Sequence, residues 1–215
     1  SGGNVGENSV REYEHKLPQP FKSATEFYSF MKEKLGDLYD KFDFEKLCPV
    51  NDENCNLKNR ELAARAFSNG SVIVNRYFGA YRAKLCPNVH NYSYSFGHYT
   101  PCLDEEKGTC RDTKNLLAWH SSEMWYTFSS LRDNVPPCRP WTELDFKLAD
   151  IYSSYWANFI KTGDPNGEGL PFWPESRENF GWMFLGDTPV GYNGMDELDK
   201  LALEYLLREG NVPVI

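Results

Sequence analysis

The segment between Thr142 and Gly163 gives the clearest structural signal in the chain. Its apolar residues recur three and four positions apart, namely Phe146, Leu148, Ile151, Tyr152, Tyr155, Phe159 and Ile160. This spacing is typical of a helix that buries one face. Gly163 marks the end of the segment, because glycine readily adopts the left-handed conformation that terminates a helix. We expect a long amphipathic helix from about Thr142 to Thr162 that packs against other elements.

Four further segments show helical spacing. Ser23–Leu35 begins with the Ser-x-x-Glu pattern of a capping box and is followed by Gly36. Helices are also predicted over Asn59–Phe67, Ser71–Leu85 and Asp196–Arg208, where apolar residues again recur three and four apart.

One segment alternates with a period of two instead. Between Val89 and Phe96, aromatic side chains occupy alternate positions, which is typical of a strand. Helices before and after a strand favour an α/β fold. A single strand cannot form a sheet. The pattern therefore indicates that the chain is one part of a larger domain.

Composition excludes several partners. The formal net charge is -8 at pH 7, whereas a protein that neutralises a phosphate backbone needs an excess of clustered Lys and Arg. No stretch approaches the roughly 20 apolar residues of a membrane-spanning helix. No Cys-x-x-Cys pair or Cys/His spacing suits zinc. We expect no nucleic acid, no transmembrane segment and no metal.

The six cysteines are better explained as disulfide partners than as metal ligands. They are Cys48, Cys55, Cys86, Cys102, Cys110 and Cys138. Cys48 and Cys55 bracket a short polar interval, as do Cys102 and Cys110, and a bridge could close either loop. The pairing is left open. Disulfides require an oxidising environment, so we expect a secreted protein or another extracytoplasmic location.

Three segments occur in an order that identifies a family. The first is Gly3-Asn4-Val5-Gly6-Glu7-Asn8-Ser9, and the second is Ala118-Trp119-His120-Ser121-Ser122-Glu123-Met124. The third runs from Tyr155 to Asn166 and continues through Leu170-Pro171-Phe172-Trp173-Pro174. They resemble, in turn, the acid turn, the histidine loop and the C-terminal helix of the type B carboxylesterase and cholinesterase family. The resemblance implies that residues 1–215 are the C-terminal part of one α/β-hydrolase domain, mostly helices with a few late sheet strands.

The resemblance also implies roles for two residues. Glu7 stands where the family has the acid of its catalytic triad, and His120 stands where it has the general base. Acyl transfer from an ester needs a hydroxyl nucleophile, an imidazole that takes its proton, and an acceptor that holds the imidazole in one tautomer. The implied function is hydrolysis of a small carboxylic ester through an acyl-serine intermediate, with no cofactor. Trp119 and Trp125 flank the histidine and are candidates to line an acyl or alcohol pocket, although core packing is the commoner role for such residues.

The chain departs from the family pattern in one major respect. The Gly-x-Ser-x-Gly nucleophile elbow does not occur in these residues, and neither do the oxyanion-hole glycines. The resemblance places the serine upstream of Glu7, so the partner of this chain is the N-terminal portion of the same esterase. In smaller departures, Gly6 replaces an Asp, and Leu117 and Ser121 replace glycines on either side of the histidine. These changes affect the flexibility of the turns.

Some residues receive a plainer interpretation. His15, His90 and His98 lack the family context, and we expect structural or solvated roles for them. The acidic cluster Asp104-Glu105-Glu106 is expected to be a solvated loop face. The alternative function is a non-catalytic adhesion or binding module of the cholinesterase-like type. A serine in the upstream elbow would favour the enzyme, and Gly or Ala at that place would favour the module.

Overall fold

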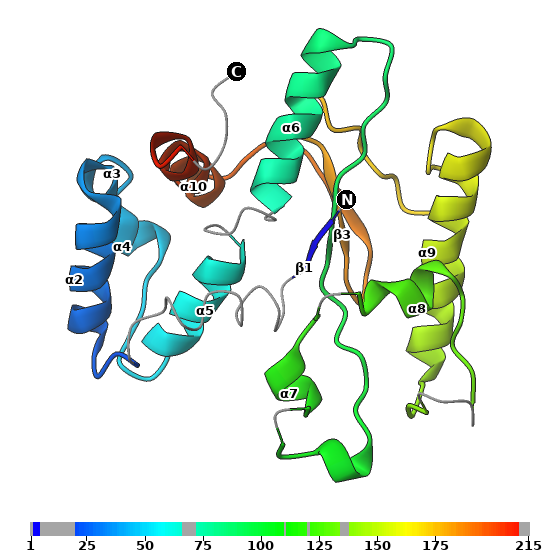
Figure 1. Ribbon diagram of the computed structural model, residues 1–215, viewed down its shortest axis with the longest axis horizontal. Coiled ribbons are helices and arrows are strands. Elements are labelled where there is room, and N and C mark those ends of the chain that lie inside the picture. The colour runs from blue at the N-terminus through cyan, green and yellow to red at the C-terminus, as the bar shows by residue number, and fades with distance from the viewer. Residues whose placement is uncertain are drawn as a thin grey trace.

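The computed structural model describes residues 2–4, 20–65, 72–109, 111–119, 121–133 and 138–210. Helices surround a small sheet in the centre of the molecule (Figure 1). The predicted class, an α/β fold made mostly of helices with a few strands, is confirmed.

Within the described residues the sheet has four strands, in the order β1 (Gly2–Asn4), β2 (Tyr94–Phe96), β3 (Trp182–Leu185) and β4 (Val190–Tyr192). Strands β1, β2 and β3 are parallel, with Asn4 opposite Phe96 and Phe96 opposite Leu185. Strand β4 is antiparallel to β3. The carboxyl ends of the three parallel strands therefore meet at one edge of the sheet.

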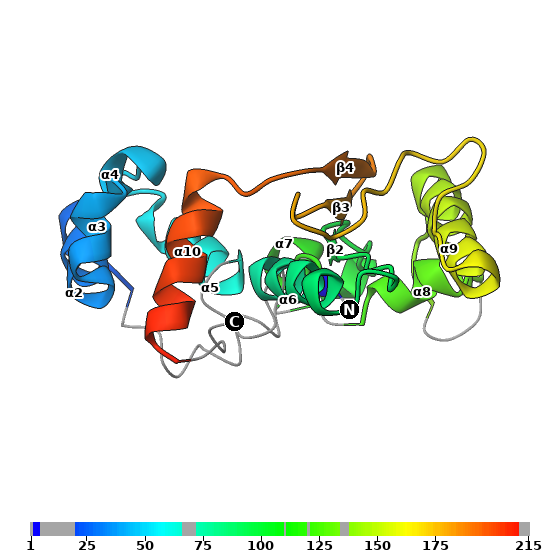
Figure 2. The same cartoon turned by 90° about the horizontal axis from the view of Figure 1, so that it is seen from above.

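The helices differ widely in length. They are α2 (Ala24–Leu35), α3 (Asp37–Lys41), α4 (Phe44–Leu47), α5 (Cys55–Arg65), α6 (Val72–Leu85), α7 (Thr113–Leu116), α8 (Glu123–Thr127), α9 (Glu143–Thr162) and α10 (Glu197–Arg208), with a 3-10 turn η1 (Asp104–Glu106). Helices α6 and α9 lie on opposite sides of the sheet, and α2 to α5 gather at the far end of the molecule from α9 (Figures 1 and 2). No helix in the described ranges is long and apolar enough to cross a bilayer.

The long helix α9 confirms the strongest prediction from the sequence. It begins after Thr142, whose hydroxyl accepts from the backbone N–H of Asp145, while the Asp145 carboxylate accepts from the N–H of Thr142. It ends at Gly163, which has a φ of 80°. These reciprocal bonds satisfy backbone donors that a helix start otherwise leaves without partners.

Two hydrophobic cores hold the fold together. The first lies between the sheet and helices α8 and α9, and includes Phe96, Tyr126, Leu148, Tyr152, Tyr155, Met183 and Leu185. The second lies among α2, α3, α4 and α5, and Leu201 of α10 belongs to it. Helix α10 also packs Ala202 against Ile73 of α6. It therefore connects the helical cluster to the side of the sheet that α6 covers.

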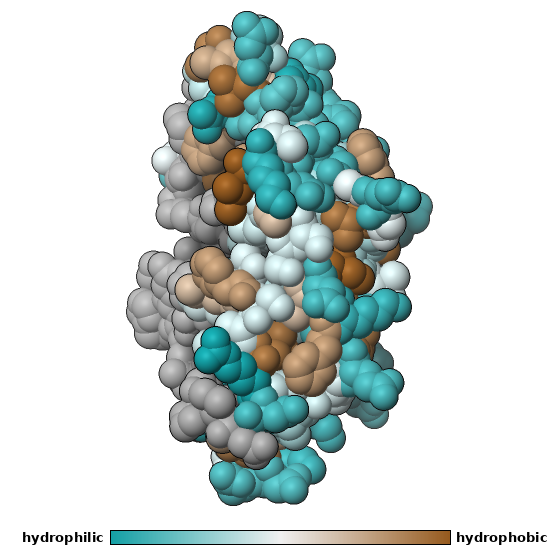
Figure 3. All heavy atoms as spheres, turned by 90° about the vertical axis from the view of Figure 1, so that its right-hand side faces the viewer, coloured by the Kyte–Doolittle hydropathy of each residue, from teal (hydrophilic) through white to brown (hydrophobic). Residues whose placement is uncertain are grey.

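The outer face of α9 is partly apolar. Phe159 and Ile160 are well exposed there, as is Phe128, which follows α8. Figure 3 shows this side of the molecule, with apolar residues in separate patches among polar ones.

Two predicted elements have different bounds. The strand expected over Val89–Phe96 is limited to Tyr94–Phe96. The carbonyl of Asn91 accepts from the N–H of Ser176, in a loop, so the residues before Tyr94 do not continue the ladder. The helix expected to begin at Asn59 begins at Cys55, after a turn in which the Asn51 side chain accepts from the N–H groups of Glu53 and Asn54 and its carbonyl accepts from the N–H of Cys55. Phe67, its expected end, lies outside the described residues.

Candidate active site

The edge where the parallel strands end is followed in the sequence by the segments that carry the predicted site residues. Strand β1 ends at Asn4, three positions before Glu7, and the neighbouring β2 ends at Phe96. The long segment that leads to His120 starts from the end of β2. Glu7 and His120 themselves lie outside the described residues.

The segment after β2 returns to the core at Ser122, directly before α8. The N–H of Ser122 donates to the carbonyl of Trp119 at 3.1 Å, and its hydroxyl donates to the same carbonyl at 2.6 Å. Ser122 is completely buried. Trp119 and Ser122 are therefore held together by two hydrogen bonds to one carbonyl oxygen.

Leu117 and Ser121 both have positive φ values. They are the two positions beside His120 where the resembled family has glycine. The φ of Leu117 is 53° with ψ of -147°, and the φ of Ser121 is 69°. Side chains with a Cβ adopt these conformations at a cost of about 1–3 kcal/mol. The backbone keeps a shape suited to glycine although the glycines are absent.

A buried polar network lies just beyond the end of β2. His98 places Nε2 at 2.9 Å from Oδ1 of Asp145 and Nδ1 at 2.6 Å from Oδ1 of Asp187. The hydroxyl of Tyr126 donates to the same oxygen of Asp145 at 2.6 Å. The other oxygen of Asp145 accepts from the backbone N–H and the hydroxyl of Thr142. His98 and Asp145 are buried, whereas Asp187 is exposed.

The charges in this network follow from its geometry. A carboxylate beside each ring nitrogen requires both to carry a proton, which makes the His98 ring a cation. Burial lowers the pKa of His98, but hydrogen bonds to Asp145 and Asp187 outweigh it and raise the pKa above its usual value. Burial raises the pKa of Asp145, but hydrogen bonds from His98, Thr142 and Tyr126 outweigh it and lower the pKa to about 2. Both shifts favour an ion pair between the His98 imidazolium and the Asp145 carboxylate.

The network was not predicted from the sequence, which gave His98 a structural or solvated role. The position of His98 two residues after a strand, at the edge where the parallel strands end, is the signal that could have found it. Its partner Asp145 was not singled out in the sequence.

Trp119 and Trp125 lie against each other beside the core. Their ring centroids are 5.4 Å apart in an edge-to-face arrangement. The ring of Trp125 also contacts Trp141, and the guanidinium of Arg139 lies 5.2 Å from its centroid. Both are half-buried. Their predicted role in a substrate pocket stays a prediction.

The sequence predicted that the acidic loop at residues 104–106 is solvated, but only part of it is. Asp104 and Glu105 are exposed, but Glu106 is buried. Its carboxylate lies 2.8 Å from Nε of Arg111 and 3.5 Å from Nη1 of Arg139. The prediction is wrong for Glu106, because two cations and the backbone N–H of residue 103 replace its water.

The cysteines occupy different environments. Cys48 and Cys55 are buried in the same helical core, Cys102 is half-buried, and Cys86 and Cys138 are exposed. Cys110 lies outside the described residues. No disulfide bond is formed in the part of the chain that the structure describes.

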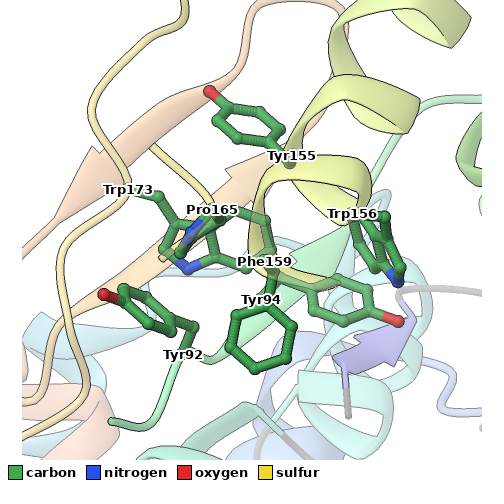
Figure 4. A pocket seen from close by; sticks show the side chains of 7 residues that line it. All are labelled: Tyr92, Tyr94, Tyr155, Trp156, Phe159, Pro165 and Trp173. Atoms are coloured by element: carbon green, nitrogen blue, oxygen red, sulfur yellow. The ribbon is translucent and has the colours of Figure 1, made fainter. Parts of the chain in front are cut away.

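A separate aromatic pocket of about 180 Å³ lies between β2 and α9 (Figure 4). Its lining residues are Tyr92, Tyr94, Tyr155, Trp156, Phe159, Pro165 and Trp173. Burial and the nearby acids Asp164 and Glu175 raise the pKa of Tyr92 to about 12. The pocket offers rings and phenol groups, so it suits an apolar group better than an acid–base reaction. Among the described residues, no group of three or more His, Cys, Asp or Glu side chains could hold a metal ion.

Comparison with known proteins agrees with the family indicated by the motifs. The model of the carboxylesterase family matches residues 15–198. Carboxylesterase 5A of Canis lupus familiaris is 40% identical over 87 residues, which cover 39% of this chain and 14% of that protein. Carboxylesterase 1E of Mus musculus is 31% identical over 144 residues, which cover 66% of this chain and 23% of that protein.

The matched regions are a small part of each relative, since the chain spans less than a quarter of their lengths. The family match nevertheless covers most of the chain, including position 120, the network around His98 and the whole of α9. Carboxylesterases are α/β-hydrolases, which confirms the predicted fold class. The chain therefore belongs to the carboxylesterase family.

Proposed function

We propose that this chain is the C-terminal part of a carboxylic ester hydrolase that acts through a Ser-His-Glu triad. Glu7 and His120 are the acid and the base, and the serine lies in the upstream portion of the same protein. Membership of the carboxylesterase family over residues 15–198 is the observation that carries this proposal.

The arrangement of the strands supports the two assignments. Glu7 follows β1 and the histidine segment follows β2, and these strands are parallel neighbours. Catalytic residues of open α/β sheets come from the carboxyl ends of neighbouring strands. Glu7 and His120 are 113 positions apart in the sequence, but the strands that precede them end at one edge of the sheet.

Each residue has one task in the reaction. The upstream serine attacks the ester carbonyl, and His120 takes the proton from its hydroxyl and later gives it to the leaving alcohol. Water then attacks the acyl-serine with the same help. Glu7 holds the imidazole in the required tautomer and stabilises the imidazolium. Trp119 and Trp125 line the pocket for the acyl or alcohol group.

The test uses the intact protein with its upstream sequence and a short-chain aryl ester. His120→Ala should lower kcat by on the order of a thousandfold or more, because the residues of a triad act as a unit. His90→Ala is the matched control, since His90 is an exposed histidine of the described part. Undiminished turnover in His120→Ala would refute the proposal. Glycine or alanine at the place of the elbow serine would instead indicate a non-catalytic binding module.

The proposal includes an oxidising location with disulfide bonds. Cys48 and Cys55 are buried in one core and are separated by a short loop, which supports a bridge between them. Peptide mapping of the secreted protein without reductant is the test. Only free thiols at both positions would contradict this part of the proposal.

A further inference from the structure

Both ends of the segment that carries His120 meet at one carboxylate. His98 lies near the start of the segment, two residues after β2, and Tyr126 lies in α8, four residues after Ser122. Both side chains contact the same atom, Oδ1 of Asp145, at 2.9 and 2.6 Å. More than twenty residues separate His98 from Tyr126, and a single carboxylate oxygen holds these two ends of the segment together.

Asp145 is itself held firmly. Its second oxygen accepts from the N–H of Thr142 at 2.7 Å and from the hydroxyl of Thr142 at 2.6 Å. It lies in the first turn of α9, the longest helix, which packs against the sheet. The side chain is almost completely buried. The segment is thus anchored to the rigid core and not only to its own turns.

We propose that Asp145 is a positioning residue for the candidate base His120, an inference that rests on the proposed function. Its carboxylate holds the strand end and helix α8 in fixed relation, and so sets where the histidine segment leaves and returns to the core. Displacing a catalytic group by about 1 Å can lower a rate by about a hundredfold.

An amide cannot replace this carboxylate. Oδ1 accepts two hydrogen bonds while Oδ2 accepts two more, so all four contacts need an acceptor. Asparagine has one accepting oxygen and one donating nitrogen. Asp145→Asn must therefore break contacts on one side. The loss of charge also weakens the contact to the His98 cation.

The test compares variants of the intact esterase, with active sites counted by titration with a fluorophosphonate. Asp145→Asn should lower kcat per titrated site about tenfold or more, leave KM within about twofold, and slow phosphonylation of the serine in parallel. Asp150→Asn is the matched control, because Asp150 is an exposed residue of the same helix. It should leave kcat within about twofold.

A purely structural role predicts a different result, namely fewer titrated sites with normal kcat at each. Asp196→Ala separates the two cases, because it removes the cap of α10 and leaves every contact of Asp145 in place. It should lower stability but leave kcat per site within about twofold. If Asp145→Asn does not fold, Tyr126→Phe removes one contact to Oδ1 and should lower kcat per site about threefold.

The inference is overturned if folded Asp145→Asn has the same kcat per site as Asp150→Asn, or, where Asp145→Asn does not fold, if Tyr126→Phe matches wild type. Failure of the proposed function has another signature, which is full turnover in His120→Ala.

Discussion

The guanidinium of Arg76 lies against the carboxylate of Asp199, with Nη1 2.8 Å from Oδ2, and both side chains are buried. Arg76 belongs to α6 and Asp199 to α10, so the pair joins the flank of the sheet to the helical cluster. The guanidinium also donates to the carbonyls of Phe180 and Gly194 and lies 5.2 Å from the ring centroid of Trp182. These contacts compensate the cost of burying the cation.

We predict that Arg76→Met lowers the free energy of unfolding by about 3–5 kcal/mol, because it leaves the Asp199 carboxylate buried without its guanidinium partner. Urea unfolding of the protein measures this. Arg82→Met is the control, since Arg82 is an exposed residue of the same helix. The double variant Arg76→Met/Asp199→Leu should recover part of the loss. Equal losses in Arg76→Met and Arg82→Met would contradict the prediction.

The contribution of His98 to stability should depend on pH. Its pKa is raised by Asp145 and Asp187 despite burial, so the stability it contributes is fully present below its unfolded value of about 6.5. That contribution is lost as the pH rises through the folded pKa. The pKa of Asp145 is lowered to about 2, so its contribution is present above an unfolded value of about 3.9 and is lost below it.

The difference in unfolding midpoint between wild type and His98→Gln should therefore be largest between about pH 4 and 6.5. Thermal unfolding from pH 3 to 9 measures it. His90→Gln controls for the loss of an imidazole at an exposed position. A difference that does not change with pH would show that the His98 ring is not a cation in the folded protein.

Helices were predicted better from the sequence than strands, for a physical reason. Helices α2, α9 and α10 each combine an apolar stripe with a capping residue, Ser23, Thr142 and Asp196, and their bounds agree with the prediction to within one residue. These signals are local, because a helix bonds to itself. Helix α5 begins earlier than expected, after a turn that Asn51 stabilises and that lies outside the apolar pattern.

Strands β1, β3 and β4 were not predicted. Each is three or four residues long, and pairing with distant segments stabilises it. Strand β3 pairs with β2 across almost ninety residues of sequence, which no local pattern encodes. The buried network has the same origin, because His98 and Asp145 lie 47 positions apart and only the packing of α9 on the sheet brings them together. Motifs could indicate candidate catalytic residues but not the buried side chains around them.

Ser121 gives a prediction about backbone strain beside His120. With a φ of 69°, it occupies a conformation that costs a side chain with Cβ about 1–2 kcal/mol. Ser121→Gly should raise the free energy of unfolding by about 0.5 kcal/mol, since glycine removes the strain but is more flexible when unfolded. Ser121→Val should lower it by more than about 1 kcal/mol, because β-branched residues rarely adopt this conformation. Thermal unfolding of wild type, Ser121→Gly and Ser121→Val measures their order of stability. A valine variant as stable as wild type would contradict the prediction.

The last prediction concerns Arg139, which contacts the segment that carries His120 at other residues than Asp145 does. Its Nη1 donates to the carbonyl of Pro101 at 2.8 Å and lies 3.5 Å from Glu106, while its planar group faces the ring of Trp125. A lysine has one compact ammonium and cannot make these contacts together. Arg139→Lys should therefore lower the free energy of unfolding by about 1–2 kcal/mol and alter the fluorescence of Trp125. Arg111→Lys is the matched control, since Arg111 also contacts Glu106 but is exposed, and its loss should stay below about 0.5 kcal/mol. If the two lysine variants are equally stable, the planar guanidinium and the ring contact of Arg139 contribute nothing to stability beyond charge.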